Sequence, residues 1–196
     1  MRRLTLLTAL VAVVALPSTA QAGCLPFTSK VFAKFNDTGL YFPAANSGFE
    51  SGTTSWAVAG GAAVATGDAT TYIGATSDAK ALSLPAGSSA TSVKVCVDPS
   101  APSMRFMLKN AGAASSKLGV DVLYTRPDGT SSTMQIAAST ATATWAPSPI
   151  TYYYVNLLAF ASSTGTTDVA FRFHPLDATG KWSIDDVYID PYKRCC

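Results

Sequence analysis

Apolar and polar residues alternate in several short segments of the chain, with the period of two that is typical of β-strands. In residues 92–98 every second residue is a valine, and Pro99 follows the segment. Residues 118–124 and 169–173 show the same alternation. Because a strand of an antiparallel sheet usually buries one face and exposes the other, this pattern predicts a half-buried strand at each of the three places.

Turn-forming residues separate these segments. The sequence Arg-Pro-Asp-Gly at residues 126–129 predicts a turn that joins the strand at 118–124 to a second strand at 133–137. Further strands are predicted at residues 104–109, 151–157 and 181–191, and the whole chain is expected to contain about ten strands. Short strands at this spacing, in a chain rich in Ser, Thr, Gly and Ala, are typical of an all-β sandwich or barrel.

The start of the chain has the composition of a secretory signal peptide. Two arginines precede an apolar run at residues 4–16, and Ala-Gln-Ala at residues 20–22 is of the cleavage-site type. The run is shorter than the about 20 residues that a spanning helix needs, and no later segment reaches that length. We therefore predict a signal peptide at residues 1–22, a single domain at residues 23–196 and a secreted protein without a membrane span.

The charge balance excludes some classes of partner. The chain has 14 Lys and Arg and 12 Asp and Glu, and two of the arginines belong to the predicted signal peptide. The mature protein is therefore neutral. A neutral chain without a basic run lacks the electrostatic footprint of a nucleic-acid-binding protein, so we predict no nucleic-acid partner. A monomer is expected.

The chain has four cysteines: Cys24, Cys96, Cys195 and Cys196. An even number in an exported chain predicts disulfide bonds, and the lack of paired C-x-x-C and histidine spacing argues against a zinc site. The adjacent Cys195 and Cys196 are not expected to bond to each other. Cys24 is therefore predicted to pair with one of them and Cys96 with the other, and the sequence leaves open which goes to which.

Nothing in the sequence resembles a catalytic motif. The chain has one glutamate, one histidine and eleven aspartates, and it contains no G-x-S-x-G, H-E-x-x-H or P-loop sequence. A glycosidase needs two carboxyl groups that flank the scissile bond. Asp185 and Asp186 are neighbours on a predicted strand and are expected to point to opposite faces of it. We therefore predict that the protein is not an enzyme.

Two motifs near the ends of the mature chain belong together. Glu50, the only glutamate, lies in Asn-Ser-Gly-Phe-Glu-Ser-Gly at residues 46–52, and Trp56 follows closely. Trp-Ser-Ile-Asp-Asp-Val-Tyr-Ile stands at residues 182–189. Together they resemble the framework of the carbohydrate-binding modules of families 4 and 9 and of related galactose-binding-like jelly rolls. The resemblance implies a jelly-roll β-sandwich of two antiparallel sheets and a non-catalytic, carbohydrate-binding function.

The resemblance also implies a structural calcium ion. One of the adjacent carboxylates Asp185 and Asp186 must lie among apolar neighbours, which is costly without a cation, a hydrogen-bond network or protonation. Modules of this kind commonly hold calcium between a carboxylate of the I-D-D-V strand and oxygens of the early segment, and calcium prefers such ligands. Asp185 is thus the first expected ligand and Glu50 the second. Alternatively, Glu50 accepts backbone N–H bonds in its own turn and Asp186 caps a loop, without metal.

A sugar site on a sandwich needs an exposed aromatic face and polar groups for the hydroxyls. The predicted strand at 151–157 places Tyr152 and Tyr154 on one side. Arg105 and Arg172 point away from the apolar faces of their strands. If these strands are neighbours, the four side chains line a concave sheet face that binds a neutral polysaccharide or oligosaccharide. The alternative is a secreted structural or adhesive sandwich that binds a protein partner and has no sugar site.

Overall fold

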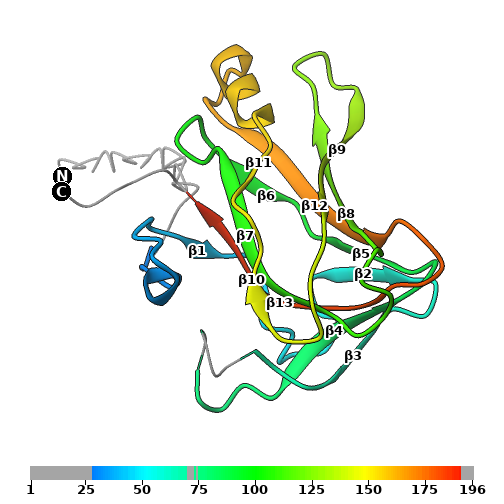
Figure 1. Ribbon diagram of the computed structural model, residues 1–196. Helices are drawn as coiled ribbons and strands as arrows, with labels where there is room; N and C mark the ends of the chain where they lie inside the picture. The colour runs from blue at the N-terminus through cyan, green and yellow to red at the C-terminus, as the bar shows by residue number, and fades with distance from the viewer. Residues whose placement is uncertain (1–27, 70–72, 74, 191–196) are drawn as a thin grey trace, which may run out of the picture.

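The computed structural model describes residues 28–69, 73 and 75–190. In this part of the chain, two antiparallel sheets pack face to face (Figure 1). The predicted all-β sandwich of two antiparallel sheets is confirmed. Among the described residues, no helix has the length and apolar character needed to cross a bilayer.

The first sheet, sheet I, contains the first and the last strand of the described chain. Its strands are β1 (Phe42–Pro43), β3 (Ala63–Thr66), β4 (Lys80–Pro85), β7 (Ser103–Asn110), β10 (Ala146–Pro147), β11 (Thr151–Tyr152) and β13 (Lys181–Asp190). They are ordered β10-β7-β13-β4-β3, with β1 paired to β13 and β11 paired to β7. A short 3₁₀ helix, η1 (Ala33–Phe35), precedes β1.

The second sheet, sheet II, is built around β12. Its strands are β2 (Trp56–Ala59), β5 (Ser89–Ser92), β6 (Val95–Val97), β8 (Leu118–Thr125), β9 (Ser131–Ser139) and β12 (Thr167–Pro175). The order is β2-β5-β12-β8-β9, and β6 pairs with β12. The 3₁₀ helix η2 (Val155–Ala161) leads from β11 of sheet I to β12 of sheet II, so it closes one end of the sandwich (Figure 1).

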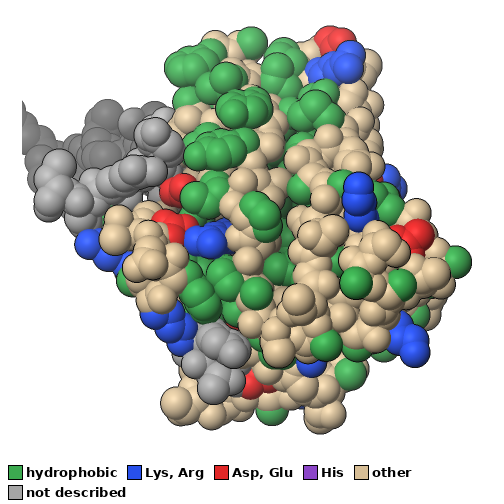
Figure 2. All heavy atoms as spheres, in the orientation of Figure 1, with side chains coloured by type: hydrophobic (Ala, Val, Ile, Leu, Met, Phe, Trp, Pro, Cys, Tyr) green, Lys and Arg blue, Asp and Glu red, His purple; other side chains and the backbone are tan. Residues whose placement is uncertain are grey.

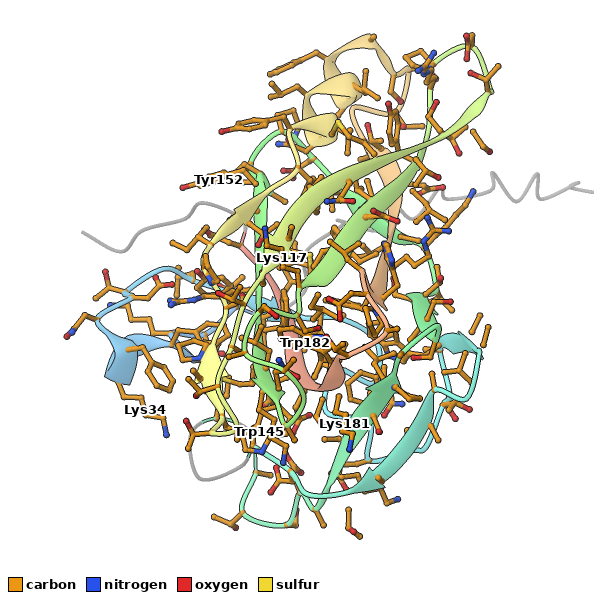
Figure 3. All side chains as sticks on the ribbon, turned by 45° about the vertical axis from the view of Figure 1, so that its right-hand side comes forward. Lys34, Lys117, Trp145, Tyr152, Lys181 and Trp182 are labelled. Carbon is orange, nitrogen blue, oxygen red and sulfur yellow. The ribbon has the colours of Figure 1, made fainter. Side chains whose placement is uncertain are left out.

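The core lies between the two sheets because every second residue of the long central strands points inward. Phe173 of β12 packs edge to face on Phe106 of β7, with ring centroids 4.9 Å apart, and lies 6.0 Å from the ring of Trp56. Trp182 of β13 is also buried there, whereas Tyr152 projects outward (Figure 3). These aromatic contacts join strands of both sheets into one apolar layer.

Most of the predicted strands are confirmed. The hairpin predicted from residues 118–124 and 133–137 is the pair β8 and β9, and residues 169–173 lie in β12. The segment at 92–98 is divided instead between β5 and β6. Val93, between the two, is half exposed, and its N–H bonds to the carbonyl of Ser55 outside the regular ladder.

The strand predicted at residues 151–157 is wrong beyond its first two residues. β11 ends at Tyr152, Tyr154 has a positive φ of 44°, and η2 begins at Val155. The side chains of 152, 153 and 154 still alternate between exposed, buried and exposed. The backbone leaves the sheet here because Asn156 is drawn inward, where its Nδ2 donates to the carbonyl of Pro99 at 2.9 Å.

Cys96 lies in β6 and is disulfide-bonded. The other cysteines, Cys24, Cys195 and Cys196, lie outside the described residues, as does the predicted signal peptide, so the pairing stays a prediction. We expect peptide mapping of the exported protein under non-reducing conditions to give two bridges, each with one cysteine of the C-terminal pair. Four thiols that react with a thiol reagent in the unfolded, unreduced protein would contradict it.

Candidate functional site

Tyr152 and Tyr154 form an exposed pair of parallel rings. Their centroids are 5.7 Å apart and their planes are inclined by 12°. Tyr152 is 39% exposed and Tyr154 is 63% exposed. β11 holds Tyr152 opposite Ser103 of β7, at the border of sheet I. Because exposure alternates over residues 152–154, the ring of Tyr154 lies on the same side as that of Tyr152.

An apolar strip continues from this pair along η2. Leu157 is 48% exposed and Phe160 is 78% exposed. Figure 2 shows hydrophobic side chains gathered over β11 and η2, at the end of the sandwich that η2 closes. We call Tyr152, Tyr154, Leu157 and Phe160 the aromatic strip. Clusters of large exposed apolar side chains on a protein surface often mark a site of interaction with a ligand or another protein.

Arg105 lies on the outer face of sheet I but is engaged in an ion pair. Its Nη1 is 2.6 Å from Asp37 Oδ2, its Nε donates to the carbonyl of Ser148, and its guanidinium lies 5.0 Å from the ring of Phe32. Burial raises the pKa of Asp37, but hydrogen bonds from Tyr41, the Gly39 backbone and Arg105 outweigh it and lower that pKa. Arg105 therefore links sheet I to the N-terminal segment, the part of the chain that carries Phe32, Asp37 and Tyr41.

This N-terminal segment covers the outer face of sheet I. Phe32 and Tyr41 are fully buried against Met107 and Tyr188, which point outward from β7 and β13. Phe32 packs edge to face on both Tyr41 and Tyr188, at 5.0 and 5.9 Å. A ligand therefore cannot lie across the middle of this face.

Arg172 and His174 lie on the outer face of sheet II, on the opposite side of the molecule from Arg105. Arg172 donates from Nε and Nη2 to Asp121 Oδ2, at 2.9 and 2.6 Å. His174 Nε2 lies 3.1 Å from the same oxygen. The other residues that β8 and β12 turn outward are Gly119, Leu123, Thr125, Asp168 and Ala170. These two strands thus present no Phe, Tyr or Trp ring on this face for a sugar.

The structure therefore brings together only some of the residues predicted to bind sugar. Tyr152 and Tyr154 are adjacent, and Arg105 is on the same sheet but is held by Asp37. Arg172 is on the other sheet. The assumption that all these strands are neighbours on one concave face is wrong, because β11 pairs with β7 whereas Arg172 is on β12. The sequence could not show which strands share a sheet.

The two sequence motifs meet at one side of sheet I, as the resemblance implied. β1 pairs with β13, the N–H of Ala44 donates to the carbonyl of Val187, and the N–H of Val187 donates to the carbonyl of Ser47. A cluster of carboxylates lies beside Gly48. The point where a Cβ would stand on Gly48 is 3.7 Å from Asp185 Oδ1, 3.9 Å from Asp186 Oδ1 and 4.0 Å from Asp78 Oδ2.

Asp185 and Asp186 face the same cluster, which corrects the expectation that they point to opposite faces. The register of β13 against β7 shifts between Asp185 and Tyr188, and Asp186 has a positive φ of 51°. Such a bulge places an extra residue in the strand and re-aims its side chain. Both carboxylates are almost fully buried, which does not suit a pair that flanks a polysaccharide bond.

Burial and the negative charges of nearby carboxylates raise the pKa values of Asp185 and Asp186. Burial, followed by the charge of Asp186, raises the pKa of Asp185 to about 8. Burial, followed by the charges of Asp78 and Asp68, raises the pKa of Asp186 to about 7. Asp185 Oδ2 accepts the N–H of Ala69 and its Oδ1 accepts the N–H of Asp186. Among the described residues, no group of three or more acidic, histidine or cysteine side chains is already arranged around a metal position.

Glu50 accepts hydrogen bonds from backbone N–H groups in this structure. Its Oε1 accepts the N–H groups of Ala79 and Lys80 at 2.8 and 2.7 Å, and Lys80 Nζ donates to the Glu50 carbonyl. These bonds fix the start of β4 next to the early motif. The sequence left open that Glu50 accepts backbone N–H bonds instead of binding calcium. Its Oε1 does accept two such bonds, but the donors are residues 79 and 80 and not residues of its own turn.

Sequence comparison finds no relative, since no protein-family profile and no curated protein matches the chain. Solved structures do match. The tandem family 22 carbohydrate-binding modules of a Paenibacillus barcinonensis protein match with a TM-score of 0.52 at 19% identity, over 78% of this chain and 46% of theirs. A xylan-binding domain from the same organism gives 0.50 at 19% identity, over 76% of this chain and 96% of its own.

A third match is a Clostridium thermocellum endo-1,4-beta-D-xylanase 10B fragment complexed with xylohexaose, with a TM-score of 0.51 at 13% identity, over 74% of this chain. This chain spans about a quarter of that protein, 27% of its length. The chain has the jelly-roll fold of carbohydrate-binding modules. At these identities the likeness concerns the fold alone. The matched modules belong to family 22, so the finer assignment to family 4 or 9 is not supported.

Proposed function

We propose that the protein is a secreted, non-catalytic carbohydrate-binding module that binds a neutral polysaccharide or oligosaccharide. The observation that carries the proposal is the exposed, parallel pair Tyr152 and Tyr154 on a jelly-roll sandwich. Aromatic rings offer an apolar face to the C–H side of a sugar ring, while the phenol hydroxyls remain in water to pair with sugar hydroxyls. The aromatic strip takes the place of the concave sheet face as the binding surface.

The same surface sets the expected strength of binding. One or two sugar rings stacked on the strip must offset the lost freedom of the ligand and the desolvation of its hydroxyls. We therefore expect dissociation constants in the micromolar to millimolar range, which correspond to a binding free energy of about 4 to 8 kcal/mol in magnitude. Xylan is the first ligand to test, because a xylan-binding domain and a xylohexaose complex are among the structures that share this fold.

Replacement of Tyr152 and Tyr154 by alanine, singly and together, is expected to abolish retention on the polysaccharide while the melting temperature stays within a few degrees of the wild type. Both side chains are exposed, so their loss leaves no cavity in the core. The measurement is affinity electrophoresis in gels with xylan and, in parallel, a broad glycan array.

The matched controls are Tyr152→Phe and Tyr154→Phe, which keep the ring faces and should keep most of the retention. Unchanged binding by the double alanine variant would show that the tyrosines are not the platform. If the wild type retains no glycan at all, the structural or adhesive role becomes the better reading, with the aromatic strip as a protein-binding surface.

We further propose that calcium stabilises the module beside Gly48. Asp185, Asp186 and Asp78 supply the hard carboxylate oxygens that calcium prefers, and the glycine leaves open the space that a Cβ would fill. Asp185 keeps its place as the first ligand. Asp186 takes the place of Glu50 as the second ligand, because Glu50 Oε1 already accepts two backbone N–H groups. The ion would neutralise buried charge and lies away from the aromatic strip, so it is not required for contact with the sugar.

A further inference from the structure

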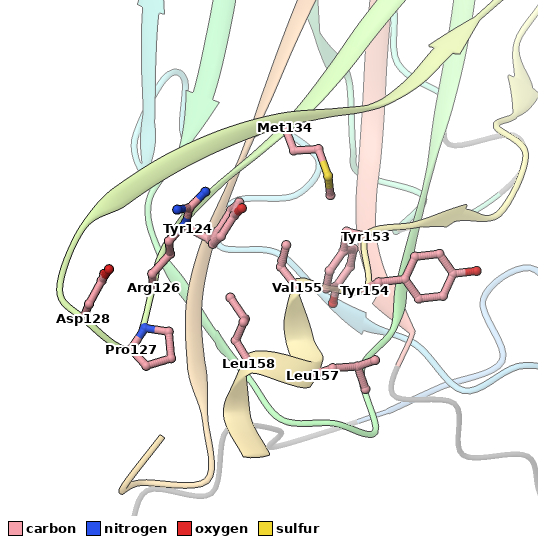
Figure 4. Close-up of a pocket in the computed structure, with 10 residues that line it drawn as sticks. All are labelled: Tyr124, Arg126, Pro127, Asp128, Met134, Tyr153, Tyr154, Val155, Leu157 and Leu158. Atoms are coloured by element: carbon pink, nitrogen blue, oxygen red, sulfur yellow. The ribbon is translucent and has the colours of Figure 1, made fainter. Parts of the chain in front are cut away.

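A pocket of about 570 Å³ opens at the end of the sandwich, between the β8–β9 turn and η2 (Figure 4). Its volume falls within the range of about 300 to 1,000 Å³ that is usual for small-molecule sites. Tyr154 of the aromatic strip also belongs to its wall. The lining residues are Tyr124, Arg126, Pro127, Asp128, Met134, Tyr153, Tyr154, Val155, Leu157 and Leu158.

The walls of the pocket suit an aromatic guest. Tyr124 and Met134 come from β8 and β9, and Leu158 faces them from η2 (Figure 4). Aromatic rings gain from edge or offset contact with tyrosine, and the flexible thioether of methionine adapts to a ring edge. Met134 is 40% exposed although it is a large apolar side chain, so cover by a guest would remove its surface from water.

The pocket continues into a polar groove of about 680 Å³, and Arg126, Pro127 and Leu158 line both. The groove carries Lys94 from the link between β5 and β6, Asp168 of β12 and a row of hydroxyls from the loop after η2. Ser162, Thr164 and Thr166 form a chain of hydroxyl contacts at 2.7 and 2.8 Å. An apolar pocket next to a groove rich in hydroxyls and charges matches a ligand with one apolar and one strongly polar half.

We propose that this pocket receives an aromatic group attached to a sugar, while the sugar lies against the polar groove or the aromatic strip; this inference rests on the carbohydrate-binding function proposed above. A ring-sized group fits the volume, which exceeds what a small acyl group such as acetyl would fill. The module would then prefer glycans that carry aromatic substituents.

The test compares phenyl β-D-xyloside, methyl β-D-xyloside and free phenol by calorimetry and by NMR shift mapping on the whole mature protein. We expect the phenyl xyloside to bind about tenfold tighter than the methyl xyloside, because the phenyl ring is removed from water. Met134→Ala should remove most of this advantage. The matched control Leu176→Ala, at a side chain that is also 40% exposed but lies outside the pocket, should keep it.

The outcomes separate this inference from the proposed function. Equal affinity for the phenyl and methyl xylosides, together with retention on xylan, would overturn the pocket and leave the carbohydrate function standing. Free phenol that binds as tightly as phenyl xyloside would overturn the claim that the aromatic group is carried by a sugar. A tenfold advantage for the phenyl xyloside without retention on any polysaccharide would keep the pocket and reject the polysaccharide function.

Discussion

Replacement of Phe173 by alanine is expected to lower the free energy of unfolding by about 3 to 5 kcal/mol. Phe173 is fully buried and is the point where the sheets meet, since its ring contacts Phe106 of sheet I and Trp56 at the edge of sheet II. Its loss removes the transfer free energy of a buried ring and leaves a cavity that two rigid sheets cannot close. Urea unfolding followed by tryptophan fluorescence measures the change.

Phe160→Ala is the matched control, because it makes the same substitution at a side chain that is 78% exposed. We expect its free energy of unfolding to stay within about 0.5 kcal/mol of the wild type. Equal stability of the two variants would mean that Phe173 does not hold the sheets together. An unchanged stability of Phe160→Ala would also show that truncation of a side chain in the aromatic strip leaves the fold intact, which is a control for the binding experiments.

The second large effect concerns calcium and the carboxylates beside Gly48. With calcium at about 100 times its dissociation constant, and binding only to the folded protein, the free energy of unfolding should rise by about 2.7 kcal/mol over that in a chelator. Thermal melting in calcium and in chelator measures the gain, and elemental analysis counts the metal. Asp185→Asn should abolish the gain, whereas Asp168→Asn, at an exposed aspartate on sheet II, should keep it.

The stability should also depend on pH in chelator. The pKa values of Asp185 and Asp186, about 8 and about 7, lie above the ordinary value of 3.8. Between these limits the folded protein binds more protons than the unfolded chain, so its stability should fall as the pH rises from about 4 to about 8. Since calcium binds the ionised carboxylates, its gain should be larger at pH 8 than at pH 5. A flat profile in chelator, with no gain from calcium, would remove the site.

The positions of most strands could be predicted from the sequence, but apart from the hairpin of β8 and β9 their pairing partners could not. The alternation in residues 118–124 and 169–173 reports burial on one face, which every strand of a sandwich experiences, so both segments appear in β8 and β12. The strand at residues 151–157 failed because the alternation of Tyr152, Tyr153 and Tyr154 persists in a backbone that has left the sheet. The alternation of buried and exposed residues shows on which side of the chain each side chain lies. It does not show which segment forms hydrogen bonds with the backbone.

The candidate site shows the same division. The exposed pair Tyr152 and Tyr154 was found from the sequence, because alternation alone placed both on one side. The engagement of Arg105 by Asp37 was missed, since these residues are 68 positions apart and meet only when the N-terminal segment covers sheet I. The pocket behind Tyr154 was also missed. Its lining comes from the β8–β9 hairpin and from the segment that contains η2, and no local signal joins these two parts of the chain.

The sequence by itself determined the all-β class and the positions of most strands, because alternation and turn residues are local properties of the chain. The meeting of the two framework motifs was expected from the resemblance to carbohydrate-binding modules and not from the residues alone. Only the tertiary structure decided which side chains share a surface. It separated Arg172 from the tyrosines and turned Asp185 and Asp186 into one cluster through a single bulge in β13. Sheet order and bulges depend on contacts between distant segments, and such contacts exist only once the sandwich has packed.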